Sequence, residues 1–121
     1  MLQLGELTSY NIAISLADRV WEIISTWDWF NKKTLGVQFV NSIDSIGGNI
    51  AEGFGRFHKK DKIKFYFNAR GSVLEALHWL NRAKIRRLID QKDFDYLRTE
   101  LEKLPREINN LINLTNRNLK K

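Results

Sequence analysis

The sequence predicts an all-α protein, and three observations support that prediction. Apolar residues recur at spacings of three and four along almost the whole chain. Proline occurs once, and no alternating run of β-branched residues lies between turn signals, so strands are not expected. The 121 residues suit one domain, 1–121, with a single core. Four amphipathic segments with short connections favour an antiparallel up-down-up-down four-helix bundle.

The helices are expected near residues 8–27, 34–57, 61–87 and 93–117. A side chain that can accept a hydrogen bond from the first helical turn stands at each start: Thr8, Thr34, Asp61 and Asp93. The polar and aromatic stretch WDWFNKK is interpreted as the connector between the first two helices. Pro105 lies within the last segment and is expected to kink or divide that helix, because it removes one backbone hydrogen bond.

Charge is distributed unevenly along the chain. Residues 1–31 hold one base and four acids, residues 32–92 hold 13 bases and five acids, and the whole chain has a net charge of +6. A basic middle section suggests an anionic partner, of which nucleic acid is the first candidate and a membrane surface the second. The alternative is that the charge serves only to keep a basic protein soluble.

The composition offers little for catalysis or for metal binding. Cysteine is absent and the two histidines are 20 residues apart, so neither a metal site nor a cofactor is expected. No apolar stretch approaches the length needed to span a bilayer, which favours a soluble cytoplasmic protein without a membrane partner. The stretch SIGGNIAEGFGRFHKKDK resembles a phosphate-binding loop only superficially, because Gly55 is followed by Arg56 and Phe57 and no strand precedes it.

The glycines of that stretch fit a helix that packs closely on a neighbour. Each glycine inside a helix costs about 1 kcal/mol relative to alanine, so Gly47, Gly48 and Gly53 need a structural reason. Polar residues repeat beside them at helical spacing, and the third helix carries a similar set. We expect a partly buried polar network, structural rather than catalytic, where the second and third helices approach. Its members would be Asn49, Glu52, Arg56, Arg70, Ser72 and Glu75.

Two motifs in this region are distinctive together. They are Ser45-Ile46-x-x-Asn49-Ile50-Ala51-Glu52-Gly53-x-x-Arg56 and Phe65-Tyr66-x-x-Ala69-Arg70-Gly71-Ser72-x-x-Glu75. The chain thereby resembles the 23S rRNA intervening-sequence protein family, whose members are encoded within bacterial ribosomal RNA genes. That family is related to the accessory variability proteins of diversity-generating retroelements. Gly47 and Gly48 depart from the Pro-Ala that family members commonly have before Asn-Ile-Ala-Glu-Gly.

The resemblance implies a fold, an assembly and no catalytic activity. It implies a four-helix bundle that forms a ring, typically a homopentamer, with an electropositive face or pore. In the retroelement relatives the ring binds nucleic acid and a reverse transcriptase. The cellular role of the intervening-sequence proteins is not implied by the resemblance.

The leading hypothesis is therefore a non-catalytic, oligomeric protein that binds nucleic acid through repeated basic surfaces. Two basic clusters flank the third helix, and their members are Lys59, Lys60, Lys62, Lys64, Arg82, Arg86 and Arg87. The alternative is a structural scaffold whose partner is a protein such as a reverse transcriptase, without direct nucleic-acid binding. Tryptophan is frequent at protein interfaces. Whether Trp27, Trp29 and Phe30 belong to the core or to an interface stays open at this point.

Overall fold

The computed structural model describes residues 2–118, and all long elements in that range are helices. The order is a 3₁₀ turn (Leu4–Glu6), α1 (Thr8–Ser25), α2 (Trp29–Asn31), a π-helical turn (Lys32–Gly36), α3 (Val37–Gly55), α4 (Lys59–Ile85) and α5 (Gln91–Asn118). No strand occurs between residues 2 and 118. The prediction of an all-α protein with four long helices is confirmed. None of the helices in this range is long and apolar enough to cross a membrane.

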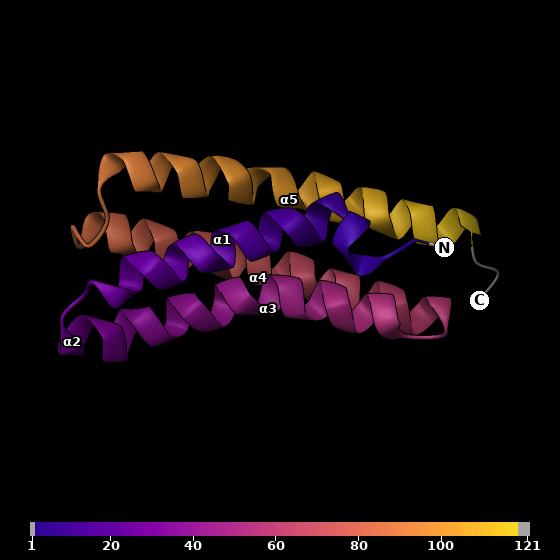
Figure 1. Cartoon of the computed structure of the whole chain (residues 1–121), viewed down its shortest axis with the longest axis horizontal. Coiled ribbons are helices and arrows are strands. Elements are labelled where there is room, and N and C mark those ends of the chain that lie inside the picture. The colour runs from indigo at the N-terminus through magenta and orange to yellow at the C-terminus, as the bar shows by residue number, and fades with distance from the viewer. Residues whose placement is uncertain (1, 119–121) are drawn as a thin grey trace.

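The four long helices lie side by side along one axis (Figure 1). α1 contacts α3 and α5, and α4 contacts the same two helices on the other side. The turns that join successive helices lie at alternate ends, so the α1–α2 turn and the α4–α5 turn share one end of the molecule (Figure 1). We call this the turn end. The arrangement is compatible with an antiparallel up-down-up-down bundle.

Side chains from all four long helices fill the core. The largest fully buried ones come from the predicted apolar stripes, and they include Leu16, Phe39, Ile43, Ile46, Ile50, Tyr66, Leu80, Leu97, Leu101, Leu104 and Ile108. Each such side chain contributes roughly 1.5–3 kcal/mol to stability through the apolar surface that it removes from water. The spacing of apolar residues thus determines which face of each helix points inward.

The predicted caps of the first two helices are wrong. α1 begins at Thr8 itself, after Leu7, and no side chain caps it. The second helical run begins at Trp29, where the Asp28 carboxylate accepts a hydrogen bond from the backbone N–H of Asn31 at 2.9 Å. The stretch interpreted as a connector is therefore largely helical, and Thr34 lies inside the π-helical turn Lys32–Gly36.

The predicted caps of the last two helices are also wrong. α4 begins at Lys59, so Asp61 lies in its first turn. α5 begins at Gln91, because Asp90 accepts a hydrogen bond from the backbone N–H of Asp93 at 2.8 Å. An aspartate three residues upstream thus takes the role assigned to Asp93. Pro105 does not divide α5, which continues from Gln91 to Asn118.

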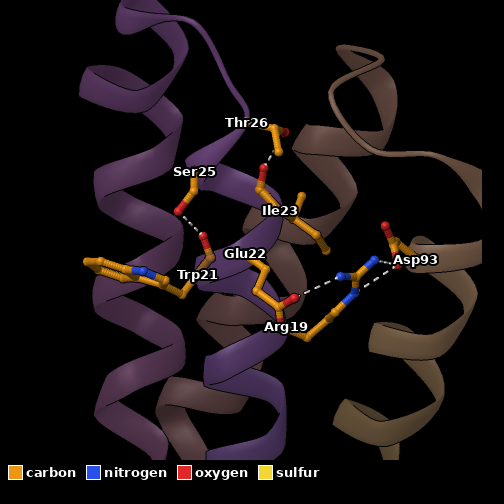
Figure 2. Close-up of polar contacts among 7 residues, drawn as sticks. All are labelled: Arg19, Trp21, Glu22, Ile23, Ser25, Thr26 and Asp93. Atoms are coloured by element: carbon orange, nitrogen blue, oxygen red, sulfur yellow. Dashed lines mark hydrogen bonds and ion pairs between the residues drawn. The ribbon is translucent and has the colours of Figure 1, made fainter.

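Because Asp90 and not Asp93 caps α5, the side chain of Asp93 is available for a different contact. Its carboxylate accepts hydrogen bonds from Nη2 of Arg19 at 2.7 Å and from Nε at 3.1 Å, which joins α5 to α1 (Figure 2). Glu22 lies 3.5 Å from the other side of the same guanidinium. The carboxylate of Asp93 raises the pKa of Arg19. This pair fixes the start of α5 against α1.

Candidate nucleic-acid interface

The four lysines predicted at the start of α4 do not share one environment. Lys60 and Lys64 are exposed, whereas Lys59 and Lys62 are half-buried. The Lys62 ammonium donates a hydrogen bond to the carbonyl of Phe54 at 2.7 Å, and burial lowers its pKa. Lysine that satisfies the last carbonyls of a helix is a capping group. Lys62 therefore caps the end of α3, and its ammonium already forms a hydrogen bond within the chain.

The three arginines at the other end of α4 are differently placed. Arg86 and Arg87 are exposed and Arg82 is half-buried. None of these three side chains forms a hydrogen bond or ion pair with another part of residues 2–118. The cluster presents its guanidinium groups to solvent at the turn end of the bundle.

Arg87 occupies a backbone position that normally favours glycine. Its φ is 59°, the only positive φ among the described non-glycine residues. The N–H of Arg87 bonds to the carbonyl of Lys84 at 3.1 Å, and the N–H of Leu88 bonds to that of Ala83 at 2.9 Å. These two bonds define a Schellman motif at the end of α4, with arginine where glycine is the usual residue. A left-handed conformation costs a non-glycine residue about 1–2 kcal/mol.

The two basic clusters lie at opposite ends of the molecule. Between Lys62 and Arg82 the helix rises about 30 Å at 1.5 Å per residue. One chain therefore cannot bring the seven predicted bases to a single short ligand. The structure gathers Arg82, Arg86 and Arg87 at the turn end, and it separates them from the lysines.

Two exposed aromatic residues lie at the turn end as well. Trp29 and Phe30 are 71% and 65% exposed, and the Lys33 ammonium lies 4.7 Å from the centroid of the Trp29 ring. Arg86 lines a hollow that also includes Thr34, which brings the π-helical turn next to the end of α4. The sequence interpretation omitted Lys32 and Lys33 from the basic set because it placed them in a connector. Their position beside aromatic residues was the available signal.

The structure shows which of the three aromatic residues Trp27, Trp29 and Phe30 belong to the core of the chain. Trp27 belongs to the core, with 8% of its surface exposed, and its indole Nε1 donates a hydrogen bond to the carbonyl of Leu88 at 2.9 Å. Trp29 and Phe30 point away from the core. The three residues are thus divided between structure and surface.

The predicted polar network between the second and third helices is not formed. Glu52 and Arg56 pair at 2.9 Å, but Glu52 lies on α3 and Arg56 directly follows its last residue, and both side chains are about half exposed. Arg70 turns the other way and donates to Asn109 of α5 at 2.6 Å. The amide of Asn49 donates to a carbonyl within its own helix.

The two remaining members of the predicted network also bond within their own helix. Ser72 donates to the carbonyl of Asn68, and Glu75 accepts from the indole of Trp79. The contact of Arg56 with α4 is made to a ring, because its guanidinium lies 4.7 Å from the centroid of Phe65. The polar side chains of the predicted network are therefore mostly solvated.

Close helix packing does explain two of the three glycines. A Cβ at Gly53 would lie 2.9 Å from the carbonyl oxygen of Lys62 and 2.7 Å from Tyr66, so α4 approaches α3 there. A Cβ at Gly47 would lie 3.2 Å from Ile14 of α1. Gly48 has open space around it, so no contact within the chain requires a glycine at that position.

The molecule is thus a basic four-helix protein that has three arginines and two exposed aromatic rings at its turn end. The sequence model of the 23S rRNA-intervening sequence protein family matches residues 5–110. The chain belongs to that family.

A solved structure supports the fold independently. The chain is similar to a protein of unknown function from the S23 ribosomal protein family of Bacteroides thetaiotaomicron, with a TM-score of 0.76 and 17% identity. The similarity covers 87% of this chain and 98% of the other. At that identity the likeness shows the fold alone. No curated protein matches the chain.

Proposed function

We propose that the protein is a non-catalytic, ring-forming homo-oligomer that binds nucleic acid through basic surfaces repeated around the ring. In this proposal the four-helix bundle forms the body of each subunit. The resemblance to the family favours a ring of five subunits. The observation that supports this proposal is the juxtaposition of Arg86 and Arg87, which have no partner in the described chain, with the exposed rings of Trp29 and Phe30 at one end.

That combination suits a single strand better than a duplex. Arginines neutralise phosphates, and each neutralised phosphate releases counterions, so affinity falls as salt rises. Exposed aromatic rings offer stacking surfaces to unpaired bases, which a duplex keeps stacked inside. Both contacts tolerate any sequence. Binding without sequence preference is therefore expected for RNA and for DNA.

Repetition around a ring compensates for the small number of bases in one subunit. Three arginines alone hold a nucleic acid weakly at physiological salt. Five copies on one rim multiply the phosphate contacts and focus the electrostatic potential. The lysines at the opposite end would form a second rim, although Lys62 contributes less because it caps α3.

Fluorescence anisotropy of a labelled single-stranded oligonucleotide tests the proposal. The variant Arg86→Glu/Arg87→Glu should lose most of the affinity and flatten the dependence of log affinity on log salt, by about 0.7 for each lost contact on a single strand. The variant Arg106→Glu/Arg117→Glu in the second half of α5 is the matched control, because it makes the same charge change on exposed residues away from the turn end. Equal losses in both variants would reduce the effect to net charge and contradict the proposal.

The exposed apolar side chains also support a second candidate function, a scaffold that binds a protein such as a reverse transcriptase. Trp21 and Leu74 are 65% and 69% exposed, which is unusual for large apolar side chains on a small bundle. A protein that binds no oligonucleotide at low salt, but retains a purified reverse transcriptase, would favour this alternative.

A further inference from the structure

α4 carries a second apolar stripe that faces away from its own bundle. Phe67, Leu74 and Ile85 are 48%, 69% and 65% exposed, and they follow a spacing of seven and eleven along one side of the helix. Gly71 and His78 lie between them on the same line and are exposed too. Alternating steps of four and three are the pattern of a helix that packs against another helix. The described part of the chain covers the inner stripe of α4 and leaves this outer one open.

Gly71 is not explained by any contact inside the subunit. It lies in the middle of a 27-residue helix, and a Cβ built there would meet nothing within 4 Å. Such a glycine costs about 1 kcal/mol relative to alanine. A neighbouring backbone that approaches closely would account for that cost. Gly48 on α3 presents the same situation, with open space at its Cβ position.

The face made by α1 and α3 is hollowed and apolar. Trp21 projects from α1 toward α3 (Figure 2). With Ile24, Val37 and Val40 it lines a groove of about 340 Å³ between the two helices. Val37 is also 47% exposed. Gly48 lies on the same outward line of α3 as Val37, eleven residues further along. We call this surface the α1/α3 groove.

Two aspartates lie about one helical turn beyond the groove, and the groove itself is lined by one charged side chain, Lys32. Asp18 and Asp44 come from α1 and α3, and neither forms an ion pair within residues 2–118. Burial raises the pKa of Asp44, and the charge of Asp18 adds to the effect. α1 and α3 together hold four acids and one base, whereas α4 holds seven bases and two acids. Lys60 and Lys64 continue the outer stripe of α4 at the same spacing.

We propose that the outer stripe of α4 packs into the α1/α3 groove of a second copy of this chain, with Lys64 approaching Asp18 and Asp44. The two surfaces match in apolar character, in exposed glycines and in opposite charge. Because they are different surfaces, the contact is head-to-tail, and a head-to-tail contact gives a ring when the rotation between neighbours closes. The inference therefore rests on the ring of the proposed function and assigns its interface. In that arrangement Lys60 and Lys64 lie in the assembly contact and do not form a second nucleic-acid rim, so the turn end is the nucleic-acid surface.

The absence of cysteine allows a direct test by cross-linking. Asp44→Cys and Lys64→Cys chains are co-expressed, and a short bis-maleimide reagent is added to the purified protein. We expect cross-linked dimers that contain one chain of each kind. Thr99→Cys replaces Lys64→Cys as the matched control, since Thr99 is exposed on α5 outside both surfaces, and it should give none. Dimers from Lys64→Cys chains alone would show that two α4 helices face each other and would overturn the proposal.

Mass measurements supply a second, independent readout. Leu74→Asp and Trp21→Ser should each lower the mass of the assembly to that of one chain in light scattering, with unchanged helicity in circular dichroism. Both residues are exposed in the subunit, so neither change should unfold it. In the Leu74→Asp protein, which should no longer assemble, the further change Gly71→Ala should raise the melting temperature of the single chain. In the parent the same change should weaken assembly. Variants that keep the parent mass would overturn the proposal.

The outcomes separate this inference from the proposed function. A parent chain that assembles through these surfaces but binds no oligonucleotide would contradict the nucleic-acid function and leave the interface standing. A parent chain that sediments as a monomer but binds oligonucleotides would overturn the interface and the ring together, and would leave only the nucleic-acid binding of the proposed function standing.

Discussion

The indole of Trp27 donates a hydrogen bond to the backbone carbonyl of Leu88 at 2.9 Å, which joins the α1–α2 turn to the α4–α5 turn. The two residues are 61 positions apart in sequence. Leu88 immediately follows Arg87, so the bond fixes the chain next to the strained arginine. The same bond brings the segment that carries Trp29 to the end of α4. It thereby assembles the candidate nucleic-acid surface from two parts of the sequence.

Arg87→Gly should stabilise the subunit and weaken its binding. Glycine adopts a positive φ without the steric cost that arginine has, so the free energy of unfolding should rise by about 1 kcal/mol. Removing the guanidinium should lower the affinity for a single strand. Chemical denaturation and anisotropy measure the two effects. Arg86→Gly is the control, because its φ of −82° gives glycine no such advantage. Tighter binding by the glycine variant at position 87 would show that this guanidinium does not contact phosphate.

Gly53→Ala should destabilise the bundle where α3 and α4 meet. The new methyl group would lie 2.9 Å from the backbone oxygen of Lys62, which cannot move without shifting α4. Overpacking of this kind costs about 1–3 kcal/mol. Gly55→Ala is the control, since nothing lies within 4 Å of that position. Thermal unfolding followed by circular dichroism compares the two variants, and equal melting temperatures would contradict the close approach.

Glu52→Ala should change stability by less than about 0.5 kcal/mol, because an exposed pair four residues apart on a helix contributes no more than that. The sequence had suggested a partly buried network between two helices at this point. The ion pair of Glu52 with Arg56 is instead about half exposed and joins α3 to the residue that directly follows it. Urea denaturation measures the change. A large loss of stability in this variant would contradict the exposed pair and would show that Glu52 belongs to a buried network.

Tyr66 should make stability fall at high pH. Burial raises the pKa of its hydroxyl to about 12, above the value of about 10 in an unfolded chain. The folded state therefore favours the protonated form, and this contribution is complete below pH 10 and lost as pH rises toward 12. It amounts to roughly 3 kcal/mol at 1.36 kcal/mol per unit. Tyr66→Phe should remove that part of the pH dependence. Urea denaturation at pH 9 and at pH 11.5 compares the two proteins.

Unchanged pH dependence in the phenylalanine variant would show that other groups cause the loss. The remaining tyrosines and the lysines titrate in both proteins, so the difference between the two curves isolates Tyr66.

The sequence predicts the elements of this fold better than their ends. Apolar spacing identifies the buried faces, because a helix needs one continuous stripe against the core. It does not decide which of two nearby polar residues caps a helix. Asp28 and Asp90 precede the predicted caps and take that role, since a carboxylate can reach the N–H groups of the first turn.

The candidate site was less predictable because it depends on how turns meet. The pattern located both basic clusters, but it could not show that Trp27 bonds to Leu88 and brings Trp29 to the same end as Arg86. The polar network failed for a related reason. Spacing aligns side chains along one helix, but it does not set the rotation of the next one. Arg70 consequently reaches Asn109 on α5.

Sedimentation velocity with a fluorescent single-stranded RNA tests the central claim most directly, because one experiment reports both assembly and binding. The account predicts that the unlabelled protein sediments as an assembly of several chains. It also predicts that the RNA moves with that assembly at low salt and separates from it at high salt. A protein that sediments as one chain, together with an RNA that sediments freely at low salt, would contradict the account.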